Sequence, residues 1–396
     1  MTDPILAVAL LVAPLVAPLV ALLVVLGGAR WLLRDLREVP RGRASHERAA
    51  SVSVVVPARD EEATLPVLLA SLRGLALGVR EVVVVDDGSR DATASVARAA
   101  GAVVLPAGAP PQAWTGKAWA CHLGAGATSG ELLLFLDADT VLGPDALDGL
   151  LELHGRHGGL VSVQPFHTVV DAYEQLSSYF NAVALLASGA FAGRPSRRPM
   201  AFGPCLLTTR ADYERAGGHA AVRGDILDDV RLAAAYGRAG LPVRCAAGGR
   251  VIRMRSYPGG LRQLAAGWTK NFASGASAAA PGPALGAGLW VGAHHAVAVG
   301  AALALLETVS GRDVSLAHGS LGLWVACWVA VSWQLRSVLR RIGSFRWWTW
   351  VLFPVPLLAF DVIFARSVVQ TAVRRSVRWR GREVDLGRRA PVEEGA

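Results

Sequence analysis

The stretch LLLFLDADT, residues 132–140, joins an apolar run that suits a buried strand to two carboxylates spaced one residue apart. Side chains alternate between the two faces of a strand, so Asp137 and Asp139 can point the same way just beyond its end. Two carboxylates in one site repel each other unless a positive charge lies between them. The stretch therefore predicts a strand that presents a pair of acids to a cation.

Strands and helices alternate along the chain before this stretch. Runs typical of buried strands occur at 51–57 (SVSVVVP), 81–85 (EVVVV) and 102–106 (AVVLP). Segments with helical periodicity separate them, at 60–72, 91–101 and 116–127. This alternation indicates βαβ units, so we expect an α/β fold with a mostly parallel, doubly wound, Rossmann-like sheet. Such sheets bind ligands beyond the carboxyl ends of their strands.

Acidic residues occupy those strand ends. The sequence PARDEE (57–62) follows the first strand, DDGSR (86–90) the second, and DADT (137–140) the last. A dinucleotide-binding fold is the main alternative, but no G-x-G-x-x-G follows the first strand. Mg²⁺ and Mn²⁺ take oxygen ligands from carboxylates and phosphates together. The acids therefore favour a divalent cation that holds a diphosphate.

Long apolar segments flank this region. Hydrophobic residues make up 53% of the 396 residues and charged residues 18%, which is low for a soluble protein. Residues 5–26 are uncharged and long enough to span a bilayer. They predict a retained anchor rather than a signal peptide, since no basic residue precedes them and no clear cleavage site follows. Further apolar segments lie at 284–309, 319–335 and 347–364.

These patterns divide the chain into five parts. We expect an N-terminal transmembrane anchor, a catalytic domain, an interfacial amphipathic segment, a C-terminal transmembrane cluster and a basic tail, at residues 1–33, 50–255, 256–283, 284–366 and 367–396. Five arginines follow the first apolar segment, between residues 30 and 43. Basic residues favour the cytoplasmic side, so we expect a multi-pass protein of the plasma membrane whose central domain, residues 50–255, lies in the cytoplasm. Residues 347–364 either span fully, which places the basic tail outside, or are re-entrant or interfacial.

The formal net charge of +9 does not indicate a nucleic-acid partner. The arginines cluster at the edges of apolar segments, where anionic lipid headgroups account for them. No zinc-finger, RNA-recognition or basic-zipper pattern accompanies them. The four cysteines, Cys121, Cys205, Cys245 and Cys327, are too far apart for a metal-binding motif.

Five motifs in order resemble the family-2 glycosyltransferases of GT-A fold, which use a nucleotide-sugar donor. They are VVVPARDEE (54–62), VVVDDGSRDAT (83–93), WTGKAWA (114–120), LLFLDADT (133–140) and GDILDDVRLA (224–233). The resemblance covers about residues 51–275. The apolar flanks and WTGKAWA resemble the membrane-bound branch that glycosylates lipids, as carotenoid-acid, hopanoid-associated and ceramide glucosyltransferases do. The tail VRWRGREV (377–384) is similar to the W-K-G-R ending of that branch.

The resemblance implies a role for each acidic motif. Asp137 of the D-x-D motif would approach the ribose and donor sugar, and Asp139 would ligate Mn²⁺ or Mg²⁺. Asp86 or Asp87 would contact the base or ribose, although the DDGS loop also fits an Asx turn that caps the next helix. The favoured donor is a UDP-hexose. Its nucleoside would be surrounded by Pro57, Ala58, Arg59 and Glu61.

The late acidic block supplies the expected base. Asp228 and Asp229 match the E-D motif of the family, in which Asp229 would be the general base and Asp228 would lie beside the donor. A single displacement would then invert the configuration of the sugar. An inactive membrane scaffold and a nucleotidyltransferase are the alternatives; the first is disfavoured because the acids are present. His219 lies shortly before this block, and a single histidine is more often structural.

Lysine usage singles out one further residue. Of 40 basic residues only Lys117 and Lys270 are lysines, so a lysine that remains can mark a need for a compact ammonium. Lys117 opens a predicted helix, where backbone N–H groups also favour an anion. We expect Lys117 to contact the diphosphate or donor sugar; the alternative is a solubilising surface lysine.

The segment RQLAAGWTKN (262–271) departs from the Q-x-x-R-W motif of processive relatives. Gln263 and Trp268 are five residues apart with no arginine between them. Trp268 is expected to stack on the sugar or acceptor, or to pack at the membrane interface. The departure favours transfer of one sugar to one lipid acceptor over processive polysaccharide synthesis.

Overall fold

The computed structural model describes residues 4–41, 51–75, 79–192, 199–225, 227–275, 280–311, 320–370, 376–379 and 382–385. The chain divides into two compact units, each assembled from three segments. The helical unit comprises Met1–Asp35, Val169–Arg194 and Ala279–Ala365, and the sheet unit comprises Leu36–Thr168, Pro195–Ala278 and Arg366–Ala396. Residues 169–194, inside the range expected for the catalytic domain, thus belong to the helical unit.

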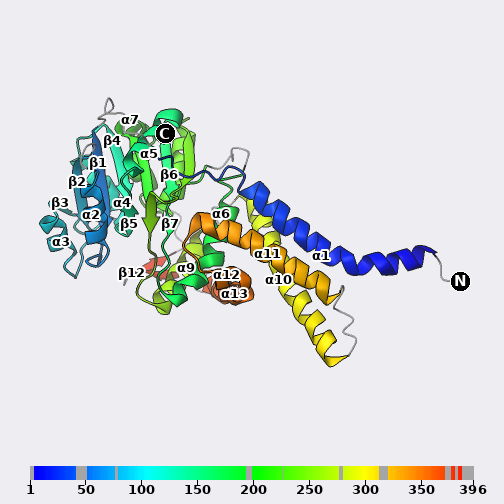
Figure 1. The fold of residues 1–396 in the computed structure, drawn as a ribbon. Helices are drawn as coiled ribbons and strands as arrows, with labels where there is room; N and C mark the ends of the chain where they lie inside the picture. The colour runs from blue at the N-terminus through cyan, green and yellow to red at the C-terminus, as the bar shows by residue number, and fades with distance from the viewer. Residues whose placement is uncertain are drawn as a thin grey trace. The chain divides into compact units, whose positions relative to one another are not determined.

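A seven-stranded sheet forms the centre of the sheet unit, in the order β3-β2-β1-β4-β8-β6-β9 (Figure 1). Its strands are β1 (Val52–Ala58), β2 (Val79–Asp86), β3 (Val103–Pro106), β4 (Leu132–Leu136), β6 (Leu160–Gln164), β8 (Cys205–Thr209) and β9 (Val243–Ala247). Strand β8 is antiparallel to both of its neighbours, and the other pairs are parallel. The predicted alternation over residues 51–136 is confirmed, and the sheet as a whole is mixed.

Helices cover both faces of this sheet. Those of the sheet unit are α2 (Leu65–Arg73), α3 (Thr93–Ala99), α4 (Gly116–Ala127), α5 (Ala146–His157), α7 (Arg210–Arg215), the 3₁₀ helix η2 (Gly218–Val222), α8 (Asp228–Arg238) and α9 (Leu261–Gly275). Val54 of β1 packs in one buried cluster with Leu68 of α2, whereas the adjacent Val55 packs in another with Cys121 of α4. Consecutive residues of β1 thus serve opposite faces, as a strand buried on both sides requires.

Close contact between α4 and β1 depends on a glycine. A Cβ added at Gly124 would lie 2.4 Å from Val55 Cγ1, so no larger residue fits there without displacing the strand. The contact fixes the first turn of α4 over the sheet. Lys117, in that turn, is positioned by the same packing.

Short elements complete the sheet unit. Strands β5 (Thr140–Leu142), β10 (Ile252–Met254) and β7 (Phe166–His167) form a three-stranded sheet in that order, and β11 (Ser376–Trp379) pairs with β12 (Arg382–Asp385). Residues 36–41 belong to this unit as well. The Val39 amide donates to the Ala247 carbonyl over 2.8 Å, and the Ala247 amide donates to the Arg37 carbonyl over 2.8 Å. These bonds occupy β9, which would otherwise be a free sheet edge.

The helical unit contains the apolar segments. Its helices are α1 (Pro4–Leu32), the 3₁₀ helix η1 (Ala172–Ser177), α6 (Ser178–Ser188), α10 (Pro281–Ser310), α11 (Leu321–Ile342), α12 (Trp347–Val351) and α13 (Pro354–Val369). In the part of the chain whose side chains are described, α10 and α11 are long and apolar enough to cross a membrane, and Val16–Leu32 forms a shorter apolar helix. Residues 347–364 form two helices, because Pro354 has no N–H to continue α12 and instead begins α13.

Polar side chains link the helices of this unit. Gln175 Oε1 accepts from the Arg346 amide over 2.9 Å and from Thr349 Oγ1 over 2.8 Å, which joins η1 to α12. His295 Nε2 lies 2.8 Å from Asp361 Oδ2, which joins α10 to α13. Such groups are costly inside a bilayer unless they pair with one another. The helices at the two expected segments 284–309 and 319–335, α10 and α11, also pack against each other.

Candidate active site

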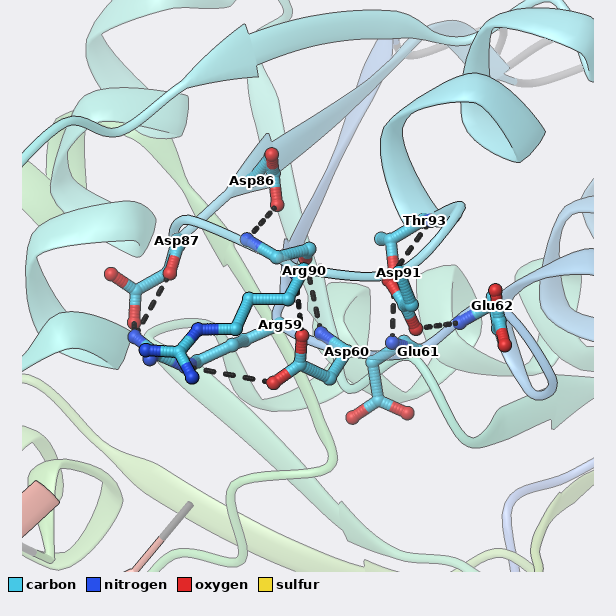
Figure 2. Close-up of polar contacts among 10 residues, drawn as sticks. Arg59, Asp60, Glu61, Glu62, Asp86, Asp87, Arg90, Asp91 and Thr93 are labelled. Atoms are coloured by element: carbon cyan, nitrogen blue, oxygen red, sulfur yellow. Dashed lines mark hydrogen bonds and ion pairs between the residues drawn. The ribbon is translucent and has the colours of Figure 1, made fainter. Parts of the chain in front are cut away.

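The loops after β1 and β2 lie against each other, because Ala58 and Asp86 pair at the ends of these parallel strands. The Arg59 side chain extends from the first loop to the second, where its Nη1 donates to the Asp87 carbonyl over 3.0 Å (Figure 2). The same nitrogen lies 3.5 Å from Asp87 Oδ2. Asp87 is 7% exposed, so its carboxylate is buried beside this guanidinium. The residues expected to bind the nucleoside, in the loops after β1 and β2, therefore contact one another.

In the second loop the Asp86 side chain bonds to the backbone three residues on, and α3 has no side-chain cap, so the loop differs from the helix-capping Asx turn that the DDGS sequence allows. Asp86 Oδ1 accepts from the Ser89 amide over 3.0 Å (Figure 2). Asp60 Oδ1 accepts from the Arg90 amide over 2.8 Å, and Thr93 Oγ1 accepts from the Glu61 amide over 2.8 Å. Asp86 is thus used in holding the loop, whereas Asp87 faces the arginine. Of the two acids, Asp87 is the one whose carboxylate is not committed to the turn.

Asp137 and Asp139 lie where the chain leaves β4, as predicted. The Asp137 amide donates to the Pro204 carbonyl and the Thr140 amide donates to the Asp137 carbonyl, each over 3.0 Å, which forms a turn between β4 and β5. Burial, together with the negative charges of Asp137 and Glu61, raises the pKa of Asp139 to about 7. A buried carboxylate beside two others favours a neighbouring cation.

Lys117 supplies one such cation. It lies in the first turn of α4, which begins after Thr115, whose Oγ1 accepts from the Ala118 amide over 3.3 Å. Lys117 Nζ lies 2.6 Å from Asp137 Oδ1, and 41% of its side-chain surface is exposed. Burial alone would lower the pKa of Lys117, but the charges of Asp137 and Asp228 outweigh burial and raise this pKa well above its ordinary value. Lys117 is therefore charged beside the acids.

The late acidic block lies on the other side of this lysine. Helix α8 begins at Asp228, which is 8% exposed. Asp229 Oδ2 accepts from the Gly203 amide and Oδ1 accepts from the Val230 amide, each over 2.8 Å. Burial and the neighbouring charge of Asp228 raise the pKa of Asp229 to about 6. Two backbone donors therefore fix a carboxylate whose pKa lies close to neutral pH.

Gly203 brings these parts together. A Cβ added there would lie 3.2 Å from Asp229 Oδ2 and 3.3 Å from Lys117 Nζ, so the Asp229 carboxylate and the Lys117 ammonium both lie next to this glycine. One pocket is lined by Pro57, Lys117, Cys121, Phe135, Leu136, Asp137, Gly203, Leu206, His219, Asp228 and Asp229. The structure thus brings five of the expected site residues into one pocket: Pro57, Lys117, Asp137, Asp228 and Asp229.

The remaining expected residues, among them the expected metal ligand Asp139, lie outside the lining of this pocket. Ala58 is buried at the end of β1, and Arg59, Glu61, Asp86 and Asp87 form the neighbouring loops. Trp268 is 7% exposed on α9, where its ring lies 5.9 Å from that of Tyr257 in an edge-to-face contact. Trp268 therefore packs against protein, and Tyr257 covers one edge of its ring.

The residues present fit a divalent cation that arrives with a diphosphate. In the described part of the chain, no three His, Cys, Asp or Glu side chains are arranged to hold a metal ion by themselves. Mg²⁺ usually takes one or two protein carboxylates and completes its shell with phosphate oxygens and water. Asp137 already pairs with an ammonium, and the pKa of Asp139 is raised by burial and by the neighbouring charges of Asp137 and Glu61. The all-oxygen donor set suits Mg²⁺ or Mn²⁺.

Sequence reasoning missed Gly203, Tyr213 and Tyr257. Tyr257 has a left-handed backbone, with φ 61°, and a Cβ added at Gly267 would lie 2.1 Å from Tyr257 Cε1. A non-glycine residue in this region is strained and is often found at functional sites. Only a tyrosine next to Pro258 and two glycines marks this bend in the sequence. Gly203 acts through its amide, and a backbone donor leaves no signature in side-chain chemistry.

The sequence is similar to those of known glycosyltransferases. The sequence model of the family described as "Glycosyl transferase family 2" matches residues 53–204. The 4,4'-diaponeurosporenoate glycosyltransferase of Staphylococcus haemolyticus is 32% identical over 349 residues, which cover 86% of this chain and 90% of the relative. The enzyme of the same name from Staphylococcus aureus is 32% identical over 346 residues, covering 85% and 89%.

Two solved structures that are similar to the chain illustrate the structural comparison. A mannosyltransferase from Pyrobaculum calidifontis, in complex with GDP-Man and Mn²⁺, matches 91% of this chain and 97% of its own, with 20% identity and a TM-score of 0.48. Glucosyl-3-phosphoglycerate synthase from Mycobacterium tuberculosis, in complex with Mn²⁺, UDP-glucose and phosphoglyceric acid, matches 62% and 87%, with 25% identity and a TM-score of 0.43. From its identity with relatives over most of its length, the chain belongs to glycosyl transferase family 2 and is a glycosyltransferase.

Proposed function

We propose that this glycosyltransferase transfers a hexose from a UDP-sugar to a carotenoid-like lipid acceptor at the membrane, with inversion of configuration. The observation that carries the proposal is the pocket in which Lys117, Asp137, Asp228 and Asp229 meet at the carboxyl end of β4. It combines a fixed carboxylate with a cation and further acids. This is what a single displacement at an anomeric carbon requires.

The donor would lie across the ends of β1, β2 and β4. Pro57, Ala58, Arg59 and Glu61 would surround the nucleoside, with Asp87 in place for the base or ribose. Asp139 would hold Mn²⁺ or Mg²⁺ against the diphosphate, and Lys117 would contact a diphosphate oxygen or the sugar. When bound, the metal ion would offset the charge that develops on the departing nucleoside diphosphate.

Asp229 would act as the general base. Its two backbone hydrogen bonds, from Gly203 and Val230, hold the carboxylate in one orientation. With a pKa of about 6 it is ionised at neutral pH and still basic enough to accept a proton. It would take the proton of the acceptor oxygen as that oxygen attacks the anomeric carbon. Only one displacement occurs, so the configuration inverts.

The acceptor class follows from the relatives and the apolar helices. Relatives named 4,4'-diaponeurosporenoate glycosyltransferase support a carotenoid acid or a similar apolar acceptor. Helices α10 and α11, together with α1, would hold the enzyme in the plasma membrane with the sheet unit in the cytoplasm. Trp268 would support the acceptor side through its contact with Tyr257. The missing Q-x-x-R-W arginine favours transfer of one sugar over chain extension.

Product analysis tests this proposal. Membranes that contain the full chain would be incubated with UDP-glucose, Mn²⁺ and a carotenoid acid, and the lipids analysed by mass spectrometry. We expect UDP and a lipid heavier by one hexose, in equal amounts. Membranes with the Asp229→Asn variant are the control for other transferases. Release of pyrophosphate would instead indicate a nucleotidyltransferase, and absence of any product with all nucleotide sugars an inactive scaffold.

A further inference from the structure

His219 lies at the inner side of the active-site pocket. It belongs to η2, is 1% exposed, and lines the same pocket as Lys117 and Asp229. Its ring packs on Phe135, with ring centroids 5.0 Å apart, two residues before Asp137 on the chain. The mechanism proposed above does not use this imidazole.

A tyrosine fixes which ring nitrogen of His219 carries the proton. The His219 amide donates to Tyr213 Oη over 3.0 Å, and the same oxygen lies 2.9 Å from His219 Nδ1. Among the described residues, Nδ1 is the acceptor available to the phenol proton, so Tyr213 donates to Nδ1. A neutral imidazole then carries its proton on Nε2. Burial and the positive charge of Lys117 lower the pKa of His219 to about 3, so the ring is neutral at working pH.

Two glycines build this arrangement. Gly217 and Gly218 have φ of 80° and 51°, a left-handed conformation that other residues rarely adopt. A Cβ added at Gly218 would lie 2.5 Å from Tyr213 Cε1, so the tyrosine ring reaches the imidazole only over a glycine. The sequence Gly217-Gly218-His219 therefore has a structural purpose. It presents a neutral N–H donor at a fixed position.

The charges of the pocket indicate what this donor binds. Three carboxylates, Asp137, Asp228 and Asp229, line the pocket against a single ammonium, that of Lys117. The metal ion at Asp139 and Lys117 would hold the diphosphate, so these carboxylates are left to accept hydrogen bonds from the hydroxyl groups of a neutral ligand. Sugar hydroxyls donate to carboxylates, and their oxygens then need N–H donors. We infer that His219 Nε2–H donates a hydrogen bond to a hydroxyl oxygen of the donor sugar.

This inference rests on the proposed function, because it assumes a nucleotide-sugar donor. It makes His219 a residue that selects the sugar and leaves nucleotide recognition to other groups. One neutral hydrogen bond corresponds to about a tenfold change in affinity. A sugar without the matching hydroxyl would leave the buried donor unpaired and would be rejected.

The test uses two variants that separate the nitrogens of the ring. Asn places its amide near the position of Nδ1, so His219→Asn keeps a partner for Tyr213 and removes the donor that faces the pocket. Gln reaches the position of Nε2, so His219→Gln keeps that donor. Calorimetry on the detergent-solubilised full chain with Mn²⁺ would measure the affinity for UDP and for UDP-glucose. No acceptor is needed, so an error about the acceptor affects only the product assay.

We expect His219→Asn to bind UDP-glucose about tenfold more weakly than the unchanged protein does. Its affinity for UDP should equal that of the unchanged protein. His219→Gln should stay close to the unchanged protein with both. If the affinities for UDP and UDP-glucose fell equally, the hydrogen bond would be to the diphosphate. If neither affinity fell, His219 would make no hydrogen bond to the donor. Either result overturns the inference. Tyr213→Phe, which removes only the oxygen that orients the ring, provides a second variant if His219→Asn does not fold. It should show a smaller loss that is again confined to UDP-glucose.

Discussion

Lys117 Nζ lies 2.6 Å from Asp137 Oδ1, and this contact joins the first turn of α4 to the end of β4. Both side chains remain partly exposed, at 41% and 28%. Ion pairs of this kind contribute little to stability. Lys117 is therefore expected to matter for the donor rather than for the fold.

Replacing Lys117 by Met should lower turnover by about 10²- to 10³-fold, the range for the loss of one preorganised contact to developing charge. The melting temperature should change little. Lys117→Arg should also lose donor affinity and turnover, because the ammonium lies close to Gly203 and a guanidinium is larger and planar. Arg156→Lys, at a surface pair with Glu152, is the matched control. Unchanged donor affinity and turnover in Lys117→Arg would contradict the need for an ammonium.

Asp229→Asn should leave UDP-glucose and Mn²⁺ binding in place but lower turnover by about 10²- to 10⁴-fold, as expected for a lost general base. The amide has nearly the same size but accepts a proton poorly. Calorimetry of the donor and a lipid-transfer assay would be compared with those for Asp228→Asn. Consecutive helix residues point about 100° apart, so only one of the two should face the acceptor. Near-normal turnover in Asp229→Asn, with Asp228→Asn inactive, would move the base by one residue.

The rate should depend on pH through the same carboxylate. The pKa of Asp229 is raised to about 6, and the base must be ionised to act. The value of kcat/KM should therefore fall as the pH decreases through about 6 and stay level above it. Rates measured from pH 5 to 8 would locate this limb. The limb should be absent from the residual activity of Asp229→Asn, and its persistence there would assign the titration to another group.

Metal removal should abolish transfer. EDTA is expected to stop the reaction, and excess Mn²⁺ or Mg²⁺ to restore it, because Asp139 and the diphosphate would hold the ion together. Asp139→Asn should weaken UDP-glucose binding in the presence of metal far more than in its absence. The metal-dependent part of donor affinity, measured by calorimetry, is the readout. Full activity in exhaustive chelator would refute a metal-dependent mechanism.

Gly267→Ala should destabilise the sheet unit by about 1–3 kcal/mol, the usual cost of overpacking. The new methyl group would displace the Tyr257 ring, which contacts Trp268. The Tyr257 hydroxyl accepts a hydrogen bond from Asn271 Nδ2 over 3.0 Å. Gly126→Ala in α4 is the control, because no atom lies within 4 Å of its Cβ position. That exposed helical substitution should stabilise by about 0.5–1 kcal/mol. Thermal unfolding of both variants would show shifts of opposite sign.

The first half of the sheet was predictable because its signals are local. Strands β1, β2 and β4 are apolar runs followed by acids, and Gly101 follows shortly after the end of α3, so periodicity and turn chemistry locate them. Strand β8 carries no such signal. A five-residue run such as Cys205–Thr209 does not reveal its direction or partners, which depend on pairing with distant strands.

The site residues likewise divide into those that the sequence predicts and those that it does not. Asp137, Asp139 and Asp229 stand out as acids in ordered motifs, and Lys117 stands out in a chain that otherwise uses arginine. The Gly203 amide that holds Asp229 belongs to the backbone, and the tautomer of His219 depends on a tyrosine brought beneath it by two left-handed glycines. Contacts of this kind exist only after the chain has folded.

The interleaving of the two units orders events during synthesis. Strand β9, the last of the seven-stranded sheet, ends at Ala247, whereas α10 begins only at Pro281. Chains fold from the N-terminus as the ribosome extends them. All residues of the seven-stranded sheet and its acids have thus been translated when only α1, η1 and α6 of the helical unit have been made. The ribosome therefore finishes the seven-stranded sheet and its acids before it supplies α10 and α11.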